Sequence, residues 1–277
     1  LANPVFTASG TCGYADELAD FMDVNKLGGF ITKSITLKPR KGNPPQRAVE
    51  TDSGMLNAIG LANIGAEAFI AEKIPLIEKL TVPVFVNVAG STIDEYVTVA
   101  EKLAGQKALA GIELNISCPN VNKGGISFGT DPLQVSEITS AVKKAAGEKI
   151  LMVKLSPCVT DISVTARAAV EAGANALSLV NTFTAMVIDI ETGRPVLANK
   201  TGGLSGPAIK PMAVYLVNKV YNDVAKAANV PIMGLGGIRT ANDAMEFIIA
   251  GATAVAVGTA TFMDPTSAVK IAEGIKK

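Results

Sequence analysis

The sequence contains no histidine. This absence excludes a Ser-His-Asp triad, a Cys-His pair, an H-E-x-x-H zinc site and an imidazole general base. Any catalytic proton transfer must therefore use cysteine, lysine, tyrosine or a carboxylate. We expect no metal site.

Net charge and long apolar runs are also missing. The 277 residues carry 25 Lys and Arg against 25 Asp and Glu, which gives a formal net charge of zero. With no basic run either, the composition argues against nucleic acid as a partner. No apolar run approaches the roughly 20 residues of a membrane span, so we expect no membrane contact.

Cysteine is sparse, with only Cys12, Cys118 and Cys158. Three thiols without C-x-x-C spacing are typical of a reduced protein, and we predict a cytoplasmic location. The chain opens at Leu1 inside a strand-like segment. We therefore expect an N-terminal segment before residue 1 to be missing from a longer protein.

Short apolar segments alternate with longer helical ones from end to end. Nearly continuous apolar runs are typical of parallel strands that are covered on both faces. Eight such strands are predicted, over residues 4–9, 29–35, 82–89, 111–117, 150–156, 176–182, 231–236 and 254–259.

Several helix boundaries carry recognisable signals. Asp followed by Pro, at 131–132 and 264–265, predicts an N-cap with proline in the first turn. Residues 240–243 resemble a capping box with Asp in place of Glu. Glycines within the repeats AGANA (172–176) and AGATA (250–254) predict two helix ends.

Eight strand-helix units in 277 residues predict a (β/α)8 TIM barrel, an α/β fold that forms one domain over residues 1–277. The alternative, a doubly wound sheet, normally opens with a glycine-rich phosphate turn that this chain lacks. Two connections are long, 36–64 and 183–206. We expect both to be insertions over the C-terminal face of the barrel, where active sites lie.

Polar residues stand near the ends of several predicted strands, where a barrel interior normally has Val, Ile or Leu. Because burying an amide or ammonium group without a partner is costly, the set predicts a polar ligand over the barrel mouth. Glu113 shares a strand face with Asn115 and could instead neutralise one lysine from below. The polar residues are Ser9, Lys33, Asn87, Asn115, Lys154 and Asn181.

Two glycine-rich turns follow the seventh and eighth predicted strands, at 234–238 and 258–260. Backbone amides at these two positions form the recurrent phosphate site of barrels, and glycine lets the backbone approach the oxygens closely. The turns predict a phosphorylated cofactor. A flavin mononucleotide (FMN) fits this pattern, and no nicotinamide fingerprint is present.

Cys118 follows the fourth predicted strand, within Asn115-Ile-Ser-Cys-Pro-Asn120. A thiol has an ordinary pKa of about 8.5 and acts as a general base where nearby lysines lower that value. The alternative is a small buried hydrophobe. The glycine-rich residues 123–129 that follow are a candidate lid. We expect Cys12 and Cys158 to be structural, with Cys158 the nearer rival as base.

Ten short motifs follow one another along the chain: residues 8–10 (ASG), 32–34 (TKS), 57–61 (NAIGL), 87–91 (NVAGS), 115–120 (NISCPN), 153–157 (VKLSP), 180–182 (VNT), 202–207 (GGLSGP), 236–237 (GG) and 258–259 (GT). In this order they resemble the catalytic FMN subunit of class 1 dihydroorotate dehydrogenases, B-type, over essentially the whole chain.

The resemblance implies an FMN-binding barrel that oxidises dihydroorotate to orotate in de novo pyrimidine (UMP) biosynthesis. It assigns Cys118 as the base that takes a proton from substrate C5, while a hydride passes from C6 to flavin N5. The lysine charges would stabilise the reduced flavin.

The resemblance also implies the contacts of both ligands. It assigns to FMN Ser9, Lys33, Ser34, Asn87, Asn115, Lys154, Val180, Gly206, Gly236, Gly237, Gly258 and Thr259. It assigns to the substrate Lys33, Asn57, Ala58, Ile59, Gly60, Leu61, Asn115, Asn120, Asn181 and Thr182.

The B-type resemblance rests on residues 121–132 and 202–211. It implies a heterotetramer in which two catalytic subunits pair as a homodimer. A partner electron-transfer subunit would carry FAD and a [2Fe-2S] cluster and reduce NAD⁺, since this chain has neither a cluster-type cysteine set nor a dinucleotide motif.

Three alternatives remain at this stage. The nearest is an A-type dihydroorotate dehydrogenase, which uses fumarate and needs no partner. A flavin barrel of the tRNA-dihydrouridine-synthase kind needs a basic RNA-binding surface, and the zero net charge argues against it. A non-catalytic barrel that binds a phosphorylated ligand would keep every activity unchanged on Cys118→Ala.

Overall fold

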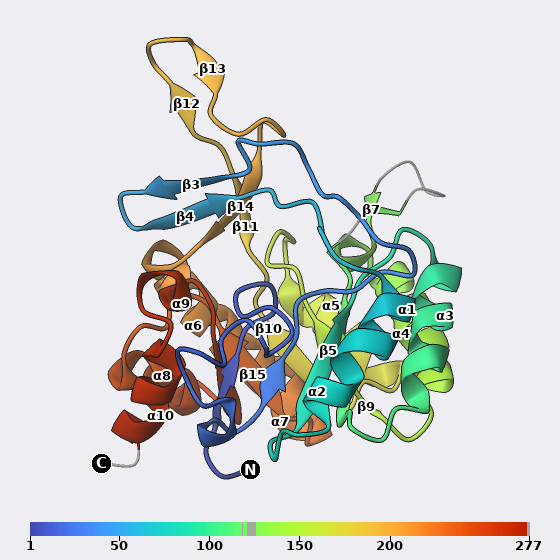
Figure 1. Cartoon of the computed structure of the whole chain (residues 1–277). Coiled ribbons are helices and arrows are strands. Elements are labelled where there is room, and N and C mark those ends of the chain that lie inside the picture. The colour runs from blue at the N-terminus through green and yellow to red at the C-terminus, as the bar shows by residue number, and fades with distance from the viewer. Residues whose placement is uncertain (118, 121–125, 276–277) are drawn as a thin grey trace.

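Eight short parallel strands form the centre of the structure, a computed structural model that describes residues 1–117, 119–120 and 126–275 (Figure 1). Their order in the sheet is β1-β16-β15-β10-β9-β6-β5-β2, and a parallel bridge from Phe6 to Gly29 joins the two edges. The bounds are β1 Val5–Thr7, β2 Phe30–Ile31, β5 Val84–Val88, β6 Gly111–Asn115, β9 Ile150–Lys154, β10 Ala176–Leu179, β15 Ile232–Leu235 and β16 Ala254–Val257.

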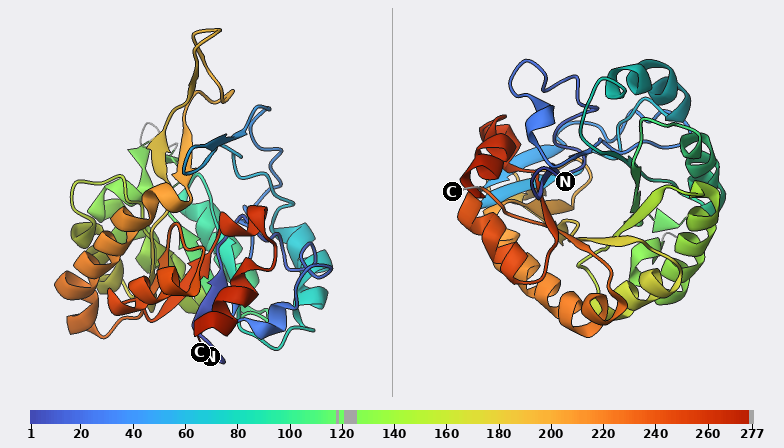
Figure 2. Two further views of the ribbon diagram at one scale, coloured as in Figure 1. Left: turned by 90° about the vertical axis from the view of Figure 1, so that its left-hand side faces the viewer. Right: turned by 90° about the horizontal axis from the view of Figure 1, so that it is seen from below.

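Each observed strand lies inside one of the eight predicted segments, and the predicted barrel is confirmed. Viewed from below, the strands form a ring with helices outside it (Figure 2). The main outer helices are α1 Ala66–Ala68, α2 Ile74–Ile77, α3 Ile93–Ala104, α4 Pro132–Ala146, α5 Ile162–Glu171, α6 Lys210–Val220, α7 Lys226–Ala228, α8 Ala241–Ile249, α9 Ala260–Met263 and α10 Ser267–Ile275. No helix among the described residues has the length and apolar character needed to cross a membrane.

Alternate strand residues fill the barrel interior with apolar side chains. Ile31, Phe85 and Met152 belong to one buried cluster that is separate from the larger cluster beneath the helices. The rings of Phe6 and Phe85 meet edge-on at 6.3 Å between centroids, although β2 lies between their strands in the sheet. This packed floor fixes the level above which polar side chains can lie.

Most of the predicted helix boundaries are confirmed. Asp131 caps α4, with its carboxylate accepting from Leu133 N at 3.0 Å, and Thr240 and Asp243 form a complete capping box on α8. Gly251, which follows α8, has φ +116°, a value that favours glycine.

The predicted start of α10 is two residues too early. The helix begins at Ser267. Asp264 Oδ1 accepts from both the backbone N and the Oγ1 of Thr266, at 2.9 and 2.6 Å. These two bonds hold residues 264–266 in a turn, and Pro265 lies in that turn instead of opening the helix.

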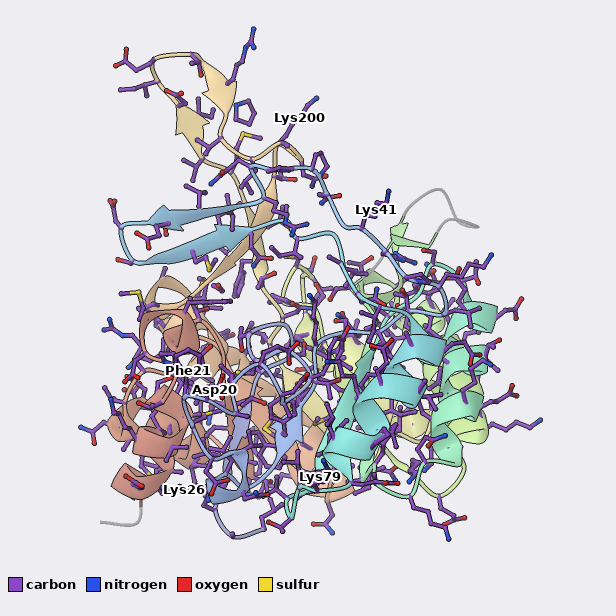
Figure 3. All side chains as sticks on the ribbon, in the orientation of Figure 1. Asp20, Phe21, Lys26, Lys41, Lys79 and Lys200 are labelled. Carbon is purple, nitrogen blue, oxygen red and sulfur yellow. The ribbon has the colours of Figure 1, made fainter. Side chains whose placement is uncertain are left out.

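The two long connections form an antiparallel sheet beyond one end of the barrel (Figure 1). Its order is β11-β14-β4-β3, from β3 Ala48–Thr51, β4 Gly54–Asn57, β11 Phe183–Ala185 and β14 Gly202–Ser205. A hairpin of β12 Ile188–Asp189 and β13 Arg194–Pro195 extends from it. Lys41 and Lys200 lie at this end and Lys26 and Lys79 at the opposite end (Figure 3). The predicted location of both insertions is confirmed, and we call this sheet the roof.

Asp243 provides a test of how one turn of the barrel is stabilised. Burial acts to raise its pKa, but hydrogen bonds from Lys210 and from the backbone N of Arg239 and Thr240 outweigh it and lower the pKa to about 2. A carboxyl group with a depressed pKa stabilises the fold above its unfolded value of about 3.9. This stabilisation is lost as the pH falls toward about 2.

We predict that Asp243→Asn lowers the free energy of unfolding by about 1 kcal/mol at pH 7, the usual effect of losing a cap. The difference from the unmodified chain should shrink below pH 4. Urea denaturation at pH 7 and pH 3 measures both effects. Asp20→Asn, at an exposed carboxylate, is the control, and an equal loss of stability in that variant would contradict the assignment.

Candidate active site

Except for Lys33, the polar residues predicted at the strand ends meet in one network of hydrogen bonds and an ion pair. Asn87 Oδ1 accepts from Ser34 Oγ and, at 3.5 Å, from Asn115 Nδ2. Asn181 Nδ2 donates to Asn115 Oδ1 at 3.3 Å and to Ser117 Oγ at 2.8 Å. Side chains from four strand ends thus form a single polar layer over the apolar interior.

Strand alternation places this layer directly above the apolar floor. Asn87 lies two residues after Phe85, Lys154 two after Met152 and Lys33 two after Ile31, so each shares the inward face of its strand with a floor residue. The mouth of the barrel is therefore lined by amides, hydroxyls and two ammonium groups.

Lys154 is offset by a carboxylate, as the sequence suggested. Glu113 has no exposed surface, and its Oε2 lies 3.9 Å from Lys154 Nζ. Lys154 Nζ also donates to Ser9 Oγ at 3.4 Å. The alternative interpretation, in which Glu113 neutralises one lysine from below, therefore holds for Lys154.

Lys33 differs from Lys154. Its side chain is half-buried, and its Nζ has no hydrogen-bond or ion-pair partner in the part of the chain that the structure describes. Its backbone N donates to Gly13 O at 2.7 Å, which fixes the main chain there. An unpaired ammonium group at the mouth is a ready partner for an anionic ligand.

The two predicted glycine turns adjoin each other at the ends of β15 and β16. Gly236 and Gly237 have φ +136° and +77°, and a Cβ on Gly237 would lie 2.7 Å from Gly206 O. Among the described residues, the backbone N–H groups of Gly236, Gly237, Gly258 and Thr259 donate no hydrogen bond. Four free backbone N–H groups, three of them on glycines that have no side chain to block access, suit an anionic group such as a phosphate.

Hydrogen bonds and close backbone contacts connect the two glycine turns to the roof. Thr259 Oγ1 donates to Ser205 Oγ on β14 at 2.8 Å. Gly206, with φ +90°, approaches the roof so closely that a Cβ there would lie 2.8 Å from Gly54 Cα. Ala208 N then donates to Ser53 O at 2.8 Å. These contacts hold the roof in register over the mouth.

A cavity of about 390 Å³ lies between the roof and the mouth. In the described part of the chain its lining contains no lysine, arginine or carboxylate, so it offers neutral donors and acceptors to a ligand with alternating N–H and C=O groups. It is lined by Asn43, Asn57, Ala58, Ser117, Thr130, Ser156, Cys158, Asn181, Thr182, Thr184, Asn199, Thr201, Gly202 and Gly203.

Several predicted substrate residues line this cavity and others do not. Asn57 and Ala58 line it, and Asn57 Nδ2 donates to Gly203 O at 3.4 Å. Gly60 and Leu61 lie in a turn of positive φ outside the lining. Ile59 O in the same turn accepts from Asn43 N at 3.0 Å. Residues 59–61 therefore shape the roof on the side of Asn43.

Val180 has a different place from the other predicted cofactor residues. Its side chain belongs to the larger apolar cluster outside the barrel interior, and its N donates to Leu235 O at 3.0 Å. Only backbone atoms of Val180 can therefore face the mouth.

The cavity also contains residues that the sequence did not single out. Asn43, Asn199 and Thr201 come from the long connections, and Thr184 from β11 of the roof. The length of those connections indicated a cover over the mouth. It could not indicate which polar side chains the pairing of β14 with β4 brings inward.

The structure describes two of the three cysteines, and these two differ in their exposure to solvent. Cys118 and residues 121–125, which include 123–125 of the predicted lid, lie outside the described residues, and Asn120 is described by its backbone alone. Cys12 is buried, and burial raises its pKa against the hydrogen bonds from Thr11 and Thr261. Cys158 is exposed and lines the cavity, with Sγ 3.7 Å from Thr184 Oγ1. The sequence predicted a structural role for Cys158, and its exposed position at the cavity keeps it the nearer rival to Cys118 as base.

The chain matches the family model described as dihydroorotate dehydrogenase over residues 1–277. A relative from Geotalea uraniireducens is 55% identical over 276 residues, covering 100% of this chain and 89% of the relative. One from Pelobacter propionicus is 54% identical over 277 residues, covering 100% and 90%. Both are described as dihydroorotate dehydrogenase B (NAD(+)), catalytic subunit.

A crystal structure of an Eimeria tenella DHODH in complex with ferulenol shares this fold, with a TM-score of 0.79. The matched region covers 98% of this chain and 80% of the Eimeria chain, and the two are 24% identical in sequence. The family match and the curated relatives carry the assignment, and the barrel agrees with it. The chain belongs to the dihydroorotate dehydrogenase family of oxidoreductases.

Proposed function

We propose that this chain uses FMN to oxidise dihydroorotate to orotate in de novo pyrimidine biosynthesis. The observation that carries the proposal is the joint placement of three features at one barrel end: free turn amides, the unpaired Lys33 ammonium and an amide-lined cavity. Together they suit a phosphorylated cofactor and a small anionic substrate with several amide groups. The names of the relatives support the reaction.

The residues around the mouth fit FMN. The turns at Gly236, Gly237, Gly258 and Thr259 leave space and free N–H groups for the phosphate. The rest of the cofactor would contact the polar layer and the neighbouring backbone. These remaining contacts are Ser9, Lys33, Ser34, Asn87, Asn115, Lys154, Val180 and Gly206.

Residues of the cavity and of the polar layer at the mouth would orient the substrate. Asn57, Asn115 and Asn181 offer both donors and acceptors to the pyrimidine ring, and the Lys33 ammonium would meet the carboxylate. Thr182 N already donates to Asn181 Oδ1 at 2.8 Å, which limits how that carboxamide can turn. Asn120 and residues 58–61 complete the proposed substrate set.

Bound FMN would supply the acceptor for the hydride from substrate C6. The chain's own task is the proton at C5, and we assign it to Cys118, the residue to which the family resemblance gives the role of base. A thiol, with an ordinary pKa of about 8.5, forms a proton-accepting thiolate far more readily than a serine hydroxyl does.

The electrons would leave through a partner. The relatives' names contain both NAD(+) and catalytic subunit, which supports a separate electron-transfer subunit. We propose that it carries FAD and a [2Fe-2S] cluster, that the catalytic chains pair as a homodimer, and that the assembly is cytoplasmic.

We predict that Cys118→Ser retains FMN but slows anaerobic flavin reduction by dihydroorotate at least 100-fold at pH 7. Loss of a general base typically costs 10²–10⁴-fold, and a serine hydroxyl is a far weaker acid than a thiol. Stopped-flow absorbance measures the rate. Cys158→Ser, at the thiol that lines the cavity, should cost less than tenfold. The reverse order of the two effects would transfer the base role to Cys158.

A second variant tests the phosphate turn. We predict that Gly237→Ala weakens FMN binding at least tenfold, because the new Cβ would crowd Gly206 O and Lys210. Fluorescence titration of the apoprotein with FMN measures the affinity. Gly147→Ala is the matched control, because Gly147 also has positive φ but has open space around it. Equal FMN affinity in both variants would contradict the proposed turn.

The electron acceptor gives a third prediction. The isolated chain, reduced with dihydroorotate, should be reoxidised slowly by fumarate and by NAD⁺ alone, because neither the FAD nor the cluster is present. Adding the electron-transfer subunit should restore fast NAD⁺ reduction. Rapid turnover with fumarate and no partner would instead identify an A-type enzyme.

A further inference from the structure

Glu113 is a buried charged group to which the proposed reaction gives no direct part. It has no exposed surface, and it lies one layer below the residues that would touch FMN. A carboxylate in such a place is costly unless donors surround it. Its contacts therefore indicate what it does for the layer above.

Both carboxylate oxygens accept hydrogen bonds. Oε2 accepts from Asn87 Nδ2 at 2.6 Å, and Oε1 accepts from Ser178 Oγ at 2.7 Å. Lys154 Nζ lies 3.9 Å from Oε2. Every neighbour with which it interacts is a donor or a cation, as an ionised carboxylate requires.

The contact with Asn87 fixes the direction of a carboxamide. Because a carboxylate can only accept, Asn87 must turn its Nδ2 downward to Glu113 and its Oδ1 toward Ser34 and Asn115. The Ser34 hydroxyl can donate or accept, so it does not decide this orientation. Glu113 does.

The contact with Lys154 fixes a charge. Lys154 is 5% exposed, and among the described residues its ammonium group also contacts the neutral Ser9 hydroxyl at 3.4 Å. With Glu113 the pair beneath the mouth sums to zero, and without it the mouth would gain one positive charge. A positive charge beside a flavin favours the reduced anionic form.

We propose that Glu113 is a positioning residue for the cofactor. It orients Asn87 and offsets Lys154, and through these two residues it sets both the affinity for FMN and the reduction potential of the bound flavin. This inference rests on the proposed FMN site, but not on the identity of the substrate.

Three variants separate the two effects. Glu113→Gln removes the charge but retains an acceptor for Asn87 and a donor to the Ser178 hydroxyl. Glu113→Leu removes both the charge and the hydrogen bonds. Ser178→Ala is the matched control, because it loses one buried contact and keeps the carboxylate.

The reduction potential is measured first, on FMN-loaded protein equilibrated with a redox dye at pH 6. At the midpoint of the unmodified protein, Glu113→Gln should raise the ratio of reduced to oxidised flavin at least tenfold, about 30 mV for a two-electron couple. Ser178→Ala should stay within threefold. An unchanged or lower ratio in Glu113→Gln would overturn the charge effect.

FMN affinity is measured on the apoproteins by fluorescence titration. Glu113→Gln should stay within threefold of the unmodified chain, and Glu113→Leu should bind at least tenfold more weakly. Equal affinities for both would overturn the orienting effect.

If Glu113→Gln does not fold, Glu113→Asp keeps the charge but shortens the reach to Asn87. It should weaken FMN binding at least tenfold, with the ratio within threefold; unchanged binding would overturn the inference.

Neither measurement uses dihydroorotate, so both hold whichever substrate the cavity accepts. Failure of the unmodified chain to bind FMN would contradict the proposed function itself. Normal FMN binding with no response to these variants would contradict the role of Glu113 alone.

Discussion

The buried carboxylate of Glu113 sits at the level where apolar packing in the barrel gives way to polar chemistry. Below it, side chains such as Phe85 and Met152 fill the interior. Above it, Asn87 and Lys154 require partners because they are almost or entirely removed from solvent. Unsatisfied amide and ammonium groups at that depth would each cost several kcal/mol, so the polar layer depends on the acceptor beneath it.

The rest of the site follows from the geometry of parallel strands. All eight strands end at the same face, so polar residues that follow inward apolar ones converge there without any long-range signal. The glycine turns after β15 and β16 lie at the same face, and contacts such as Thr259 to Ser205 connect them to the roof. The cavity is thus bounded below by the barrel and above by its own insertions.

This geometry explains which features of the fold and the site could be predicted from the sequence. The eight strands and the two glycine turns depend on local patterns and on a general rule of barrels, and both were predicted. Pairing of Glu113 with a lysine was only an alternative, and the sequence did not indicate that the lysine is Lys154. The roof residues Asn199 and Thr201 were not, because their position depends on the register of β14 against β4, where Gly203 pairs with Asn57. No local periodicity encodes a pairing between residues so far apart. The early start predicted for α10 failed for a local reason, the Asp264 side chain holding Thr266 in a turn.

In the function proposed for this chain, FMN bound at the barrel mouth accepts a hydride from dihydroorotate. The most direct test is the absorbance spectrum of the purified chain, loaded with FMN, during anaerobic addition of dihydroorotate. The flavin absorption band should bleach when the substrate is added, and one orotate should form for each flavin that is reduced. A flavin band that persists in the presence of excess dihydroorotate would contradict it.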